Sequence, residues 1–494
     1  MLGRIILSIA IGVSAVSTLS AQAIPDRPEK ITFPRLSFQV PKAKDYKTSL
    51  KNKIPVYISD NASNAPIINV SIHWRGGGYM EPTGKEGLAG CYGSLLASSG
   101  STKLEIEKQE DILDNLAASI SSNCGPIDGS ISMRCLAKDF DQVFGLMMDT
   151  FNHPAFLQNR LDLNKRRTRQ ALLLRNNEVT MIASYQMGHL LRGEDHFSVR
   201  SSTPASIDSI TREDLLAFHS RIKHPSNFIV TISGKFDRKP VMDKLNATVG
   251  SMKASKDAQI SPKIPVPEFT RTPGIYVVDR ANAPQAVVQW AFPGMRRGDP
   301  DWHAAVVMNQ ILGGGFTSRL MAKIRSDEGL TYGIRTALGE GANWTGDFTG
   351  SAQTSNNTVA YLMKLALAEM DKLKKVALTN DELKAVKEGL IDSFPSQWAK
   401  SAIVSRFASE AMDGWPEDWW INYREKIQAV TAADVQRMAN RLLDMDKMIV
   451  LAVGQASVIE AGDHDRIVLL KDILPLPMQR LPLRDPMTGK PMPK

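Results

Sequence analysis

Cysteine is scarce in this chain: Cys91, Cys124 and Cys135 are the three among 494 residues. A low, odd number argues against a disulfide framework and against a cysteine-rich zinc site. It leaves open one bridge with a free thiol, or three thiols. The sequence also lacks clusters of basic residues interleaved with aromatic ones, so nothing favours nucleic-acid binding. Beyond the N-terminal segment, no apolar run approaches the length that crosses a membrane.

The overall composition is that of an ordinary globular protein. Hydrophobic residues make up 43% and charged residues 23%, which excludes a disordered, collagenous or coiled-coil chain. At roughly 100–200 residues per domain, the length predicts two to four domains. The net charge of +8 is modest for this length and indicates a basic soluble protein.

The N-terminus has the pattern of an export signal. Arg4 precedes an apolar run over residues 5–16, and Ala21-Gln22-Ala23 follows as a small-x-small cleavage site. We expect cleavage after Ala23, which would leave an exported, periplasmic and soluble chain. An uncleaved anchor is the alternative. No cysteine follows the apolar run, so a lipid anchor is not indicated.

Four short patterns recur in the same order and at nearly the same spacing. Tyr57 in residues 55–60 recurs as Tyr276 in 274–279. Asn-Ala-Pro at 64–66 recurs at 282–284. Thr211 and Gly234, with their neighbours, recur as Thr431 and Gly454. Four ordered matches at a single period indicate two homologous halves.

The two halves also have matching secondary-structure patterns. Apolar and polar residues alternate over 68–74 and 286–292, which predicts strands with one buried face. Helices are expected at about 86–98 and 302–312. Further helices, capped by Thr211 and Thr431, should precede apolar strands at 228–233 and 448–453. Each half is therefore expected to be an α+β sandwich with a mixed or antiparallel sheet.

The predicted organisation has five parts. Residues 1–23 form the signal peptide, 24–250 the N-terminal half, 251–273 a Pro-rich linker, 274–473 the C-terminal half and 474–494 a Pro-rich tail. The proline content predicts an extended, semi-rigid linker. The tail should also be extended, as a surface-bound or disordered end, or as a partner-binding arm.

Several motifs together resemble the pitrilysin/insulinase family of zinc metallopeptidases. These are Gly-Tyr-Met-Glu-Pro at 78–82, Gly-Leu-Ala at 87–89, residues 196–215, Leu-Gly-Gly-Gly-Phe-Thr-Ser-Arg-Leu at 312–320 and Ile-Arg-Ser-Asp-Glu-Gly-Leu-Thr-Tyr at 324–332. The resemblance covers most of residues 45–460. It implies two homologous halves that form a clamshell, as in the paired subunits of the mitochondrial processing peptidase.

The metal motif of that family is missing from this sequence. Active members carry His-x-x-Glu-His directly after Gly-Leu-Ala, where two histidines bind Zn²⁺ and the glutamate is the general base. Here Gly90, Gly93 and Ser94 stand at the three positions. The later helix that supplies a third ligand in the family corresponds to residues 164–175, which contain no carboxylate. We therefore predict no metal and no cofactor in this chain, with zinc in a partner subunit.

The second half keeps Arg325 and Tyr332 in the register of the family motif. The resemblance implies that this pair reaches a partner's active site, where it positions substrate and supports the oxyanion. Arginine offers forked donors to carbonyl oxygens, and a tyrosine hydroxyl can stabilise a developing oxyanion. The alternative is a purely structural arginine and tyrosine.

Other conspicuous residues are expected to be structural. Residues 313–315 (Gly-Gly-Gly) lack the lysine of a phosphate loop and predict a helix C-cap and tight turn. We expect His196 to be structural, Trp415, Trp419 and Trp420 to lie in the core or line the clamshell, and residues 165–169 to form a solvated helix face. Cys91 is expected to be a small buried side chain.

The sequence thus predicts a non-catalytic, substrate-positioning subunit of an exported zinc metallopeptidase. It would act on peptides as a heterodimer with a homologous zinc-bearing subunit, without nucleic acid or membrane partners. The alternative is a stand-alone peptide-holding or structural protein without protease activity. An autonomous hydrolase is disfavoured, because Cys91 has no histidine near it in sequence.

Overall fold

The structure is a computed structural model that describes residues 27, 31, 38–260, 263–267, 272–463 and 465–493. The chain divides into two compact units, Met1–Gln39 and Val40–Lys494, and the following description concerns the second. The predicted signal peptide, parts of the predicted linker and His464 lie outside the described residues.

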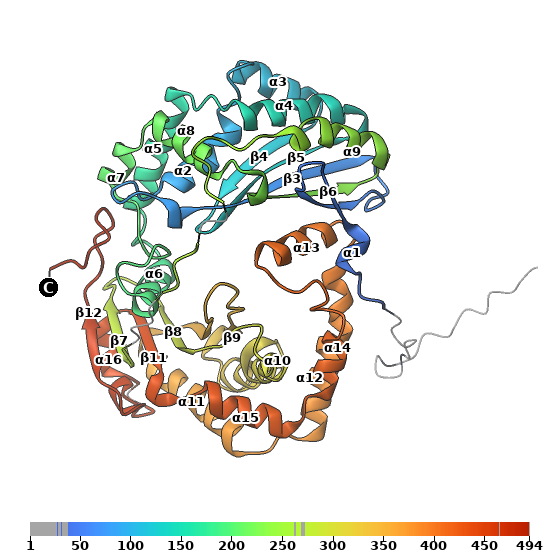
Figure 1. Ribbon diagram of the computed structural model, residues 1–494. Helices are drawn as coiled ribbons and strands as arrows, with labels where there is room; N and C mark the ends of the chain where they lie inside the picture. The colour runs from blue at the N-terminus through green and yellow to red at the C-terminus, as the bar shows by residue number, and fades with distance from the viewer. Residues whose placement is uncertain are drawn as a thin grey trace, which may run out of the picture. The chain divides into compact units, whose positions relative to one another are not determined.

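The described strands form two six-stranded sheets (Figure 1). The first has the order β1-β2-β6-β3-β5-β4 and the second β12-β7-β11-β8-β10-β9. The strands of the first sheet are β1 (Lys47–Ser49), β2 (Pro55–Ser59), β3 (Ile67–Arg75), β4 (Ser119–Cys124), β5 (Asp128–Leu136) and β6 (Phe228–Gly234). Those of the second are β7 (Gly274–Asp279), β8 (Ala286–Pro293), β9 (Thr331–Leu338), β10 (Asp347–Thr354), β11 (Ile449–Gly454) and β12 (Met478–Leu481).

Helices from both parts of the sequence surround these sheets. Those in the first half are α1 (Ala43–Tyr46), α2 (Leu88–Ser98), α3 (Ile106–Asn115), α4 (Phe140–Asn152), α5 (Gln158–Leu173), α6 (Val179–Arg192), α7 (Pro204–Ser209), α8 (Arg212–Ile222) and α9 (Arg238–Ala247). The later ones are α10 (Trp302–Asn309), α11 (Val359–Lys375), α12 (Asn380–Ser393), α13 (Ile403–Met412), α14 (Tyr423–Ala429), α15 (Ala432–Leu442) and α16 (Ala456–Ala461). The predicted α+β class with two sheet-bearing halves is therefore confirmed.

The first sheet has an apolar face and a more polar face, as the alternation over 68–74 predicts. The expectation of one buried face over 286–292 is wrong, because both faces of β8 are buried, one of them against α6. On β3, Ile68, Val70, Ile72 and Trp74 are buried in the core of the first half, whereas the residues between them are less buried. Ser71 of β3 lies opposite Ser132 of β5, and the Ser132 hydroxyl donates to the Ser71 hydroxyl at 2.8 Å. The side-chain amide of Asn123 on β4 donates to the hydroxyl of Ser130 on β5 at 3.1 Å. Burial of the apolar face stabilises the first sheet and leaves these hydroxyl and amide side chains on the opposite face.

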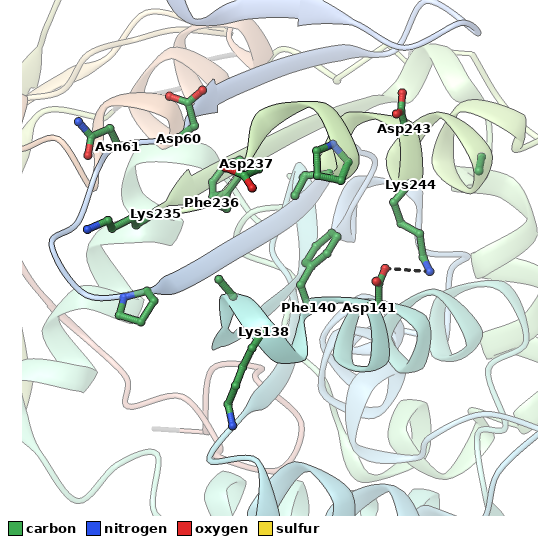
Figure 2. A pocket seen from close by; sticks show the side chains of 15 residues that line it. Asp60, Asn61, Lys138, Phe140, Asp141, Lys235, Phe236, Asp237, Asp243 and Lys244 are labelled. Carbon is green, nitrogen blue, oxygen red and sulfur yellow. Dashed lines mark ion pairs between the residues drawn. The ribbon is translucent and has the colours of Figure 1, made fainter.

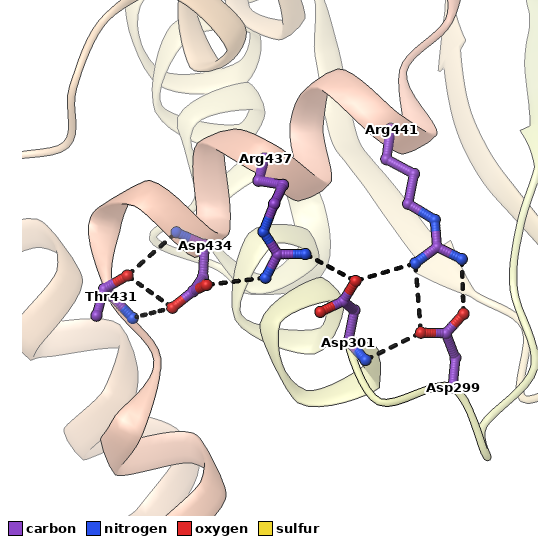
Figure 3. A network of polar contacts seen from close by, with 6 residues as sticks. All are labelled: Asp299, Asp301, Thr431, Asp434, Arg437 and Arg441. Atoms are coloured by element: carbon purple, nitrogen blue, oxygen red, sulfur yellow. Dashed lines mark hydrogen bonds and ion pairs between the residues drawn. The ribbon is translucent and has the colours of Figure 1, made fainter.

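The predicted threonine caps are present in both halves. Thr211 and Thr431 each accept from the backbone N–H three residues later, and Asp214 or Asp434 closes a capping box. In the second half this cap continues into a surface network (Figure 3). There, Arg437 and Arg441 of α15 pair with Asp299 and Asp301, which precede α10. The network ties α15 to the N-terminal end of α10.

Each half places one helix on the sheet of the other half. α6 packs on β8 and β11 of the second sheet, and α13 packs on β2 and β6 of the first (Figure 1). The ring of Phe407 on α13 stacks on Tyr57 of β2 at 6.1 Å between centroids. Arg75 of β3 donates to the carbonyl of Ala411 at 3.0 Å, near the C-terminal end of α13. This reciprocal exchange makes each sheet's packing depend on the other half.

The C-terminal tail is anchored to both halves. β12 pairs in parallel with β7, at the edge of the second sheet. Arg484 is only 6% exposed. Its guanidinium donates to Glu194 at 2.9 Å and to the side-chain oxygen of Gln186 on α6 at 3.2 Å. These contacts fit a surface-bound tail and not a disordered end, because a buried cation needs its fixed partners.

The glycine run at 313–315 ends a helix and is followed by a turn, as the sequence predicts, but the last helical residues are π-helical. Residues Gln310–Gly314 continue α10 as a π-helical segment, and Gly315 caps it in extended backbone with φ −128°. Left-handed backbone is therefore not the reason for these glycines. A Cβ on Gly313 would lie 2.7 Å from the hydroxyl of Thr336, and one on Gly314 would lie 2.8 Å from Asn309. Close packing against β9 explains Gly313, and the side chain of Asn309 on α10 explains Gly314.

Among the described residues, none of the helices has the length and apolar character needed to cross a membrane.

We predict that His219 makes the fold sensitive to acid. Its Nδ1 shares a 2.9 Å hydrogen bond with the hydroxyl of Tyr92, and burial lowers its pKa from 6.5 to about 3. Because the folded-state pKa is depressed, the neutral ring contributes stability that is complete above pH 6.5 and is lost as the pH falls toward 3. In His219→Gln, denaturant unfolding followed between pH 7 and pH 5 should have a shallower pH dependence, by up to about 1.4 kcal/mol per pH unit.

The control is His153→Gln, because His153 is exposed and its replacement removes no buried ring. An unchanged slope in His219→Gln would contradict the assignment.

Candidate functional site

Helix α2 is the element on which the family's metal motif would lie. It begins after Gly87, whose φ of 101° is accessible mainly to glycine. The carboxylate of Glu81 accepts from the backbone N–H of Gly87 at 3.2 Å and of Ala89 at 2.8 Å, so it caps the helix from a distance. Burial raises the pKa of Glu81, although both backbone donors oppose this shift. The Gly-Tyr-Met-Glu-Pro and Gly-Leu-Ala motifs therefore serve to start α2.

The three degenerate motif positions lie on α2 in two different environments. Gly90 and Ser94 are exposed on one helix face, whereas Gly93 is buried against β4. A Cβ on Gly93 would lie 2.1 Å from the backbone nitrogen of Cys124, and one on Gly90 would meet nothing within 4 Å. The hydroxyl of Ser122 on β4 donates to the carbonyl of Gly93 at 2.7 Å. The position of the family's general base is therefore closed by the backbone of β4.

The neighbouring residues of α2 do not replace the missing ligands. Cys91 is buried, and burial raises the pKa of its thiol to about 12. Tyr92 points into the core, where it meets His219 and the ring of Phe218.

α5, which packs on α2, carries basic and amide side chains over residues 164–170. Two of these side chains, Lys165 and Arg169, contact Asp208. Arg166 and Arg167 are not buried, so most of the helix face that was predicted to be solvated does point to solvent.

The residues present at α2 and α5 do not fit the zinc ion that the family implies. Zinc needs deprotonated thiolates, neutral imidazoles or carboxylates that converge at about 2.0–2.3 Å. α2 offers two glycines, a serine hydroxyl and a protonated thiol at this place. Throughout the described residues, no group of three or more histidine, cysteine, aspartate or glutamate side chains is arranged to hold a metal ion. We therefore derive no catalytic step through a metal in this chain.

Arg325 and Tyr332 are brought together at the edge of the second sheet. Arg325 lies on the π-helical segment Met321–Asp327, and Tyr332 lies on the edge strand β9. The guanidinium carbon of Arg325 lies 5.8 Å from the ring centroid of Tyr332 and 4.8 Å from that of Phe316. Tyr332 is 94% exposed and Phe316 is 72% exposed. Sequence reasoning missed Phe316, although an isolated aromatic residue beside three glycines was a signal available for it.

We call Phe316, Arg325 and Tyr332 the arginine–aromatic cluster. Gly329, with φ 65°, reverses the chain between Arg325 and Tyr332. Leu330 donates its backbone N–H to the carbonyl of Ile324 at 3.0 Å, which holds this turn. In the described part of the chain, the cluster makes no hydrogen bond or ion pair with α2 or α5. Its forked donors and phenol are therefore available to an external group.

The tryptophans near residue 420 surround a buried arginine. The guanidinium carbon of Arg297, a residue that is 2% exposed, lies 4.6, 5.0 and 4.7 Å from the ring centroids of Trp415, Trp419 and Trp420. Glu410 accepts from Arg297 at 2.7 Å and from the indole of Trp420 at 3.2 Å. These contacts satisfy the cation and fit a structural role for the tryptophans.

His196 lies among aromatic rings. It packs against Phe197 and Trp344, with ring centroids 4.4 and 5.8 Å away. These contacts fit the structural role expected from the sequence.

A groove of about 1070 Å³ lies in the first half, away from α2 (Figure 2). Its charged lining is balanced between Lys138, Lys235 and Lys244 and the carboxylates Asp60, Asp141, Asp237 and Asp243. Lys244 and Asp141 form an ion pair of 3.0 Å across one end. A mixed lining of this kind on the protein surface favours no particular chemistry.

Comparison with known proteins places this architecture in a family. Residues 209–390 match the model of the peptidase M16 inactive domain. Non-peptidase homolog YmxG of Helicobacter pylori is 25% identical over 69% of this chain and 78% of its own length. An uncharacterized zinc protease of Streptomyces coelicolor is 25% identical over 49% of this chain and 53% of its own length.

Solved structures share the fold. A peptidase M16 inactive domain from Pseudomonas fluorescens has a TM-score of 0.72 at 22% identity and covers 83% of this chain and 98% of its own. The periplasmic protease PqqL of Escherichia coli has a TM-score of 0.69 at 16% identity, with 89% of this chain matched to 49% of PqqL. Together with the two six-stranded sheets, these neighbours fit a clamshell of two halves.

The fold and the matched domain define a peptidase-like chain of the two-sheet type. The chain resembles the pitrilysin (M16) family: residues 209–390 match its inactive domain, a non-peptidase homologue matches over 69% of the chain, and solved structures of this type share the fold. Relatives described as zinc proteases and one described as a non-peptidase both match, so similarity alone does not separate the two classes. The residues at positions 90, 93 and 94 are the difference from the family's metal motif.

We predict opposite effects of adding a methyl group at two glycines of α2. Gly93→Ala should lower the free energy of unfolding by about 1–3 kcal/mol or more, because the new Cβ overlaps the backbone of β4. Gly90→Ala is the matched control on the same helix. It should raise that free energy by up to about 1 kcal/mol, because its Cβ meets nothing and alanine favours helix. Denaturant unfolding at neutral pH measures both, and an undiminished stability of Gly93→Ala would contradict the close approach.

Proposed function

We propose that this chain is the non-catalytic, substrate-positioning subunit of an exported zinc metallopeptidase. It acts on peptides together with a homologous subunit that carries the zinc, and it holds no metal or cofactor itself. The observation that carries the proposal is the arginine–aromatic cluster, which holds a half-buried cation beside an exposed phenol in a chain whose motif helix lacks catalytic groups. Exposed aromatic side chains that flank an arginine are typical of recognition surfaces.

The chemistry of the cluster suits support of a reaction in another subunit. The faces of Phe316 and Tyr332 hold the Arg325 guanidinium by cation–π attraction and leave its N–H groups free. Those donors can bind peptide carbonyl oxygens, and the Tyr332 hydroxyl can donate to an oxyanion. The partner supplies zinc and the attacking water. The peptide adds a strand to a sheet edge in that subunit, a mode that depends little on peptide sequence.

Two observations support a partner. α2 has neither the donors nor the space for a hydrolytic centre. The arginine–aromatic cluster makes no polar contact with α2 in the described residues, so its donors do not serve a site there.

A second candidate is a peptide-holding protein that works without a protease. The hydroxyl- and amide-rich face of the first sheet favours it, because it offers hydrogen bonds to an extended chain. Co-purification of the natively expressed protein separates the two candidates. A zinc-bearing homologue recovered at equal stoichiometry supports the peptidase subunit, and a lone monomer or self-dimer supports the second candidate.

In the reconstituted pair, Arg325→Ala should lower kcat by about 10²–10³, because removal of an oxyanion donor typically has that effect. Tyr332→Phe should also lower kcat while its ring still flanks Arg325. The exposed Arg238 provides the control, since Arg238→Ala removes one positive charge elsewhere. Unchanged turnover in both Arg325→Ala and Tyr332→Phe would remove the catalytic-support role.

Export predicts a specific mature N-terminus. When the full sequence is expressed in a Gram-negative host, N-terminal sequencing of the periplasmic fraction should begin at Ile24. Ala23→Leu should block processing, because the cleavage site requires small residues. A full-length product confined to the cytoplasm would argue against export.

A further inference from the structure

One face of the second sheet carries a cationic side chain beside α6. Gln289, Ser351 and Arg335 lie directly opposite one another on β8, β10 and β9. Their neighbours in each strand are buried on the other side, so these three share one face of the sheet. α6 packs on β8 and β11, and β9 is the edge strand, so this row continues beyond the helix.

A cavity of about 340 Å³ lies between α6 and this face of the sheet. Ser184, Met187 and Leu191 of α6 form one wall. Gln289, Arg335, Ala337, Thr349 and Ser351 line it from the three strands. The cavity combines an aliphatic wall with hydroxyl, amide and guanidinium donors, and no acidic residue lines it.

Arg335 has no carboxylate partner in the described part of the chain. It is exposed, and it forms no ion pair or hydrogen bond with another described residue. β9 itself has no acidic residue. The acidic residue of β10, Asp347, is already paired with Arg192 of α6. The cavity therefore has one uncompensated positive charge.

We propose that this cavity is a carboxylate-binding subsite for an extended peptide. Arg335 supplies forked donors to the two carboxylate oxygens, Ser351 and Gln289 add neutral hydrogen bonds, and Met187 and Leu191 pack against the aliphatic part. The carboxylate belongs either to a glutamate or aspartate side chain or to the peptide's C-terminus.

This inference rests on the proposed binding of peptides and adds a charge preference to it. One member of the arginine–aromatic cluster, Tyr332, lies on the same strand as Arg335, three residues before it on β9. A peptide that is bound at the partner's sheet edge and also contacts β9 would present its backbone to Arg325 and Tyr332 and one carboxylate to the cavity.

The test uses fluorescence anisotropy with short labelled peptides of extended, neutral sequence. Three have an amidated C-terminus and differ only at a central glutamate, glutamine or lysine. A fourth has the central glutamine and a free C-terminal carboxylate. We expect the full chain to bind either the glutamate peptide or the free-carboxylate peptide about tenfold or more tightly than the amidated glutamine peptide, because a charge-assisted hydrogen bond is worth that factor. The peptide that gains affinity identifies the source of the carboxylate.

Arg335→Met keeps the aliphatic stem and should abolish that difference. Arg335→Glu should reverse it in favour of the lysine peptide. Arg238→Met is the matched control, because it removes an exposed arginine that lines no described cavity.

Equal affinity for all four peptides would overturn the subsite and leave peptide holding intact. An equal loss in Arg238→Met and Arg335→Met would also overturn it, because net charge would then explain the preference. Absence of binding by every peptide would contradict peptide holding itself, and with it the subsite.

Discussion

The exchange of α6 and α13 between the two halves is the constraint on which the rest of the structure depends. Each sheet uses the opposite half's helix to cover part of one face, and the two helices occupy equivalent places in the internal repeat. Burial of apolar surface is the main favourable term in folding, so neither half can complete its packing alone. The exchange leaves the outer strands β4 and β9 uncovered by these helices. The degenerate motif helix and the arginine–aromatic cluster lie beside those strands.

The degenerate metal motif differs from the family's motif in packing as well as in residue identity. In a chain that had lost only its ligands, the space around α2 would remain. In this chain, Gly93 approaches the backbone of β4, and the Ser122 hydroxyl fixes that approach. The helix has been absorbed into the core of the first half, where Tyr92 and His219 are bonded to each other. The second half, by contrast, keeps Arg325 and Tyr332 together at the sheet edge. The two halves have therefore diverged in what they offer to a ligand.

Much of the fold could be predicted from the sequence because it depends on local patterns. Alternation over 68–74 predicts β3, and Thr211 and Thr431 predict the starts of α8 and α15, since strand faces and caps are set by neighbouring residues. The helix exchange could not be predicted, because the apolar face of α6 does not specify which sheet it meets. The burial of Arg484 depends on Glu194, which is remote in sequence. The glycines at 313–315 predict the end of the helix, but the contact of Gly313 with Thr336 of a later strand could not be predicted. Arg325 and Tyr332 could be placed from their motif, whereas Phe316 and the Arg335 cavity required the arrangement of strands.

The position of α6 has a consequence for the order of assembly. Its apolar face rests on β11, which is among the last strands of the chain to be synthesised. During synthesis, the apolar face of this helix therefore stays exposed until most strands of the second sheet have been made. A chain that must cross a membrane before folding would meet the same delay on the far side. The closing contact, between Arg484 and α6, is made by one of the last segments to emerge. The packing of α6, a helix of the first half, is therefore complete only after these residues of the second half have been synthesised.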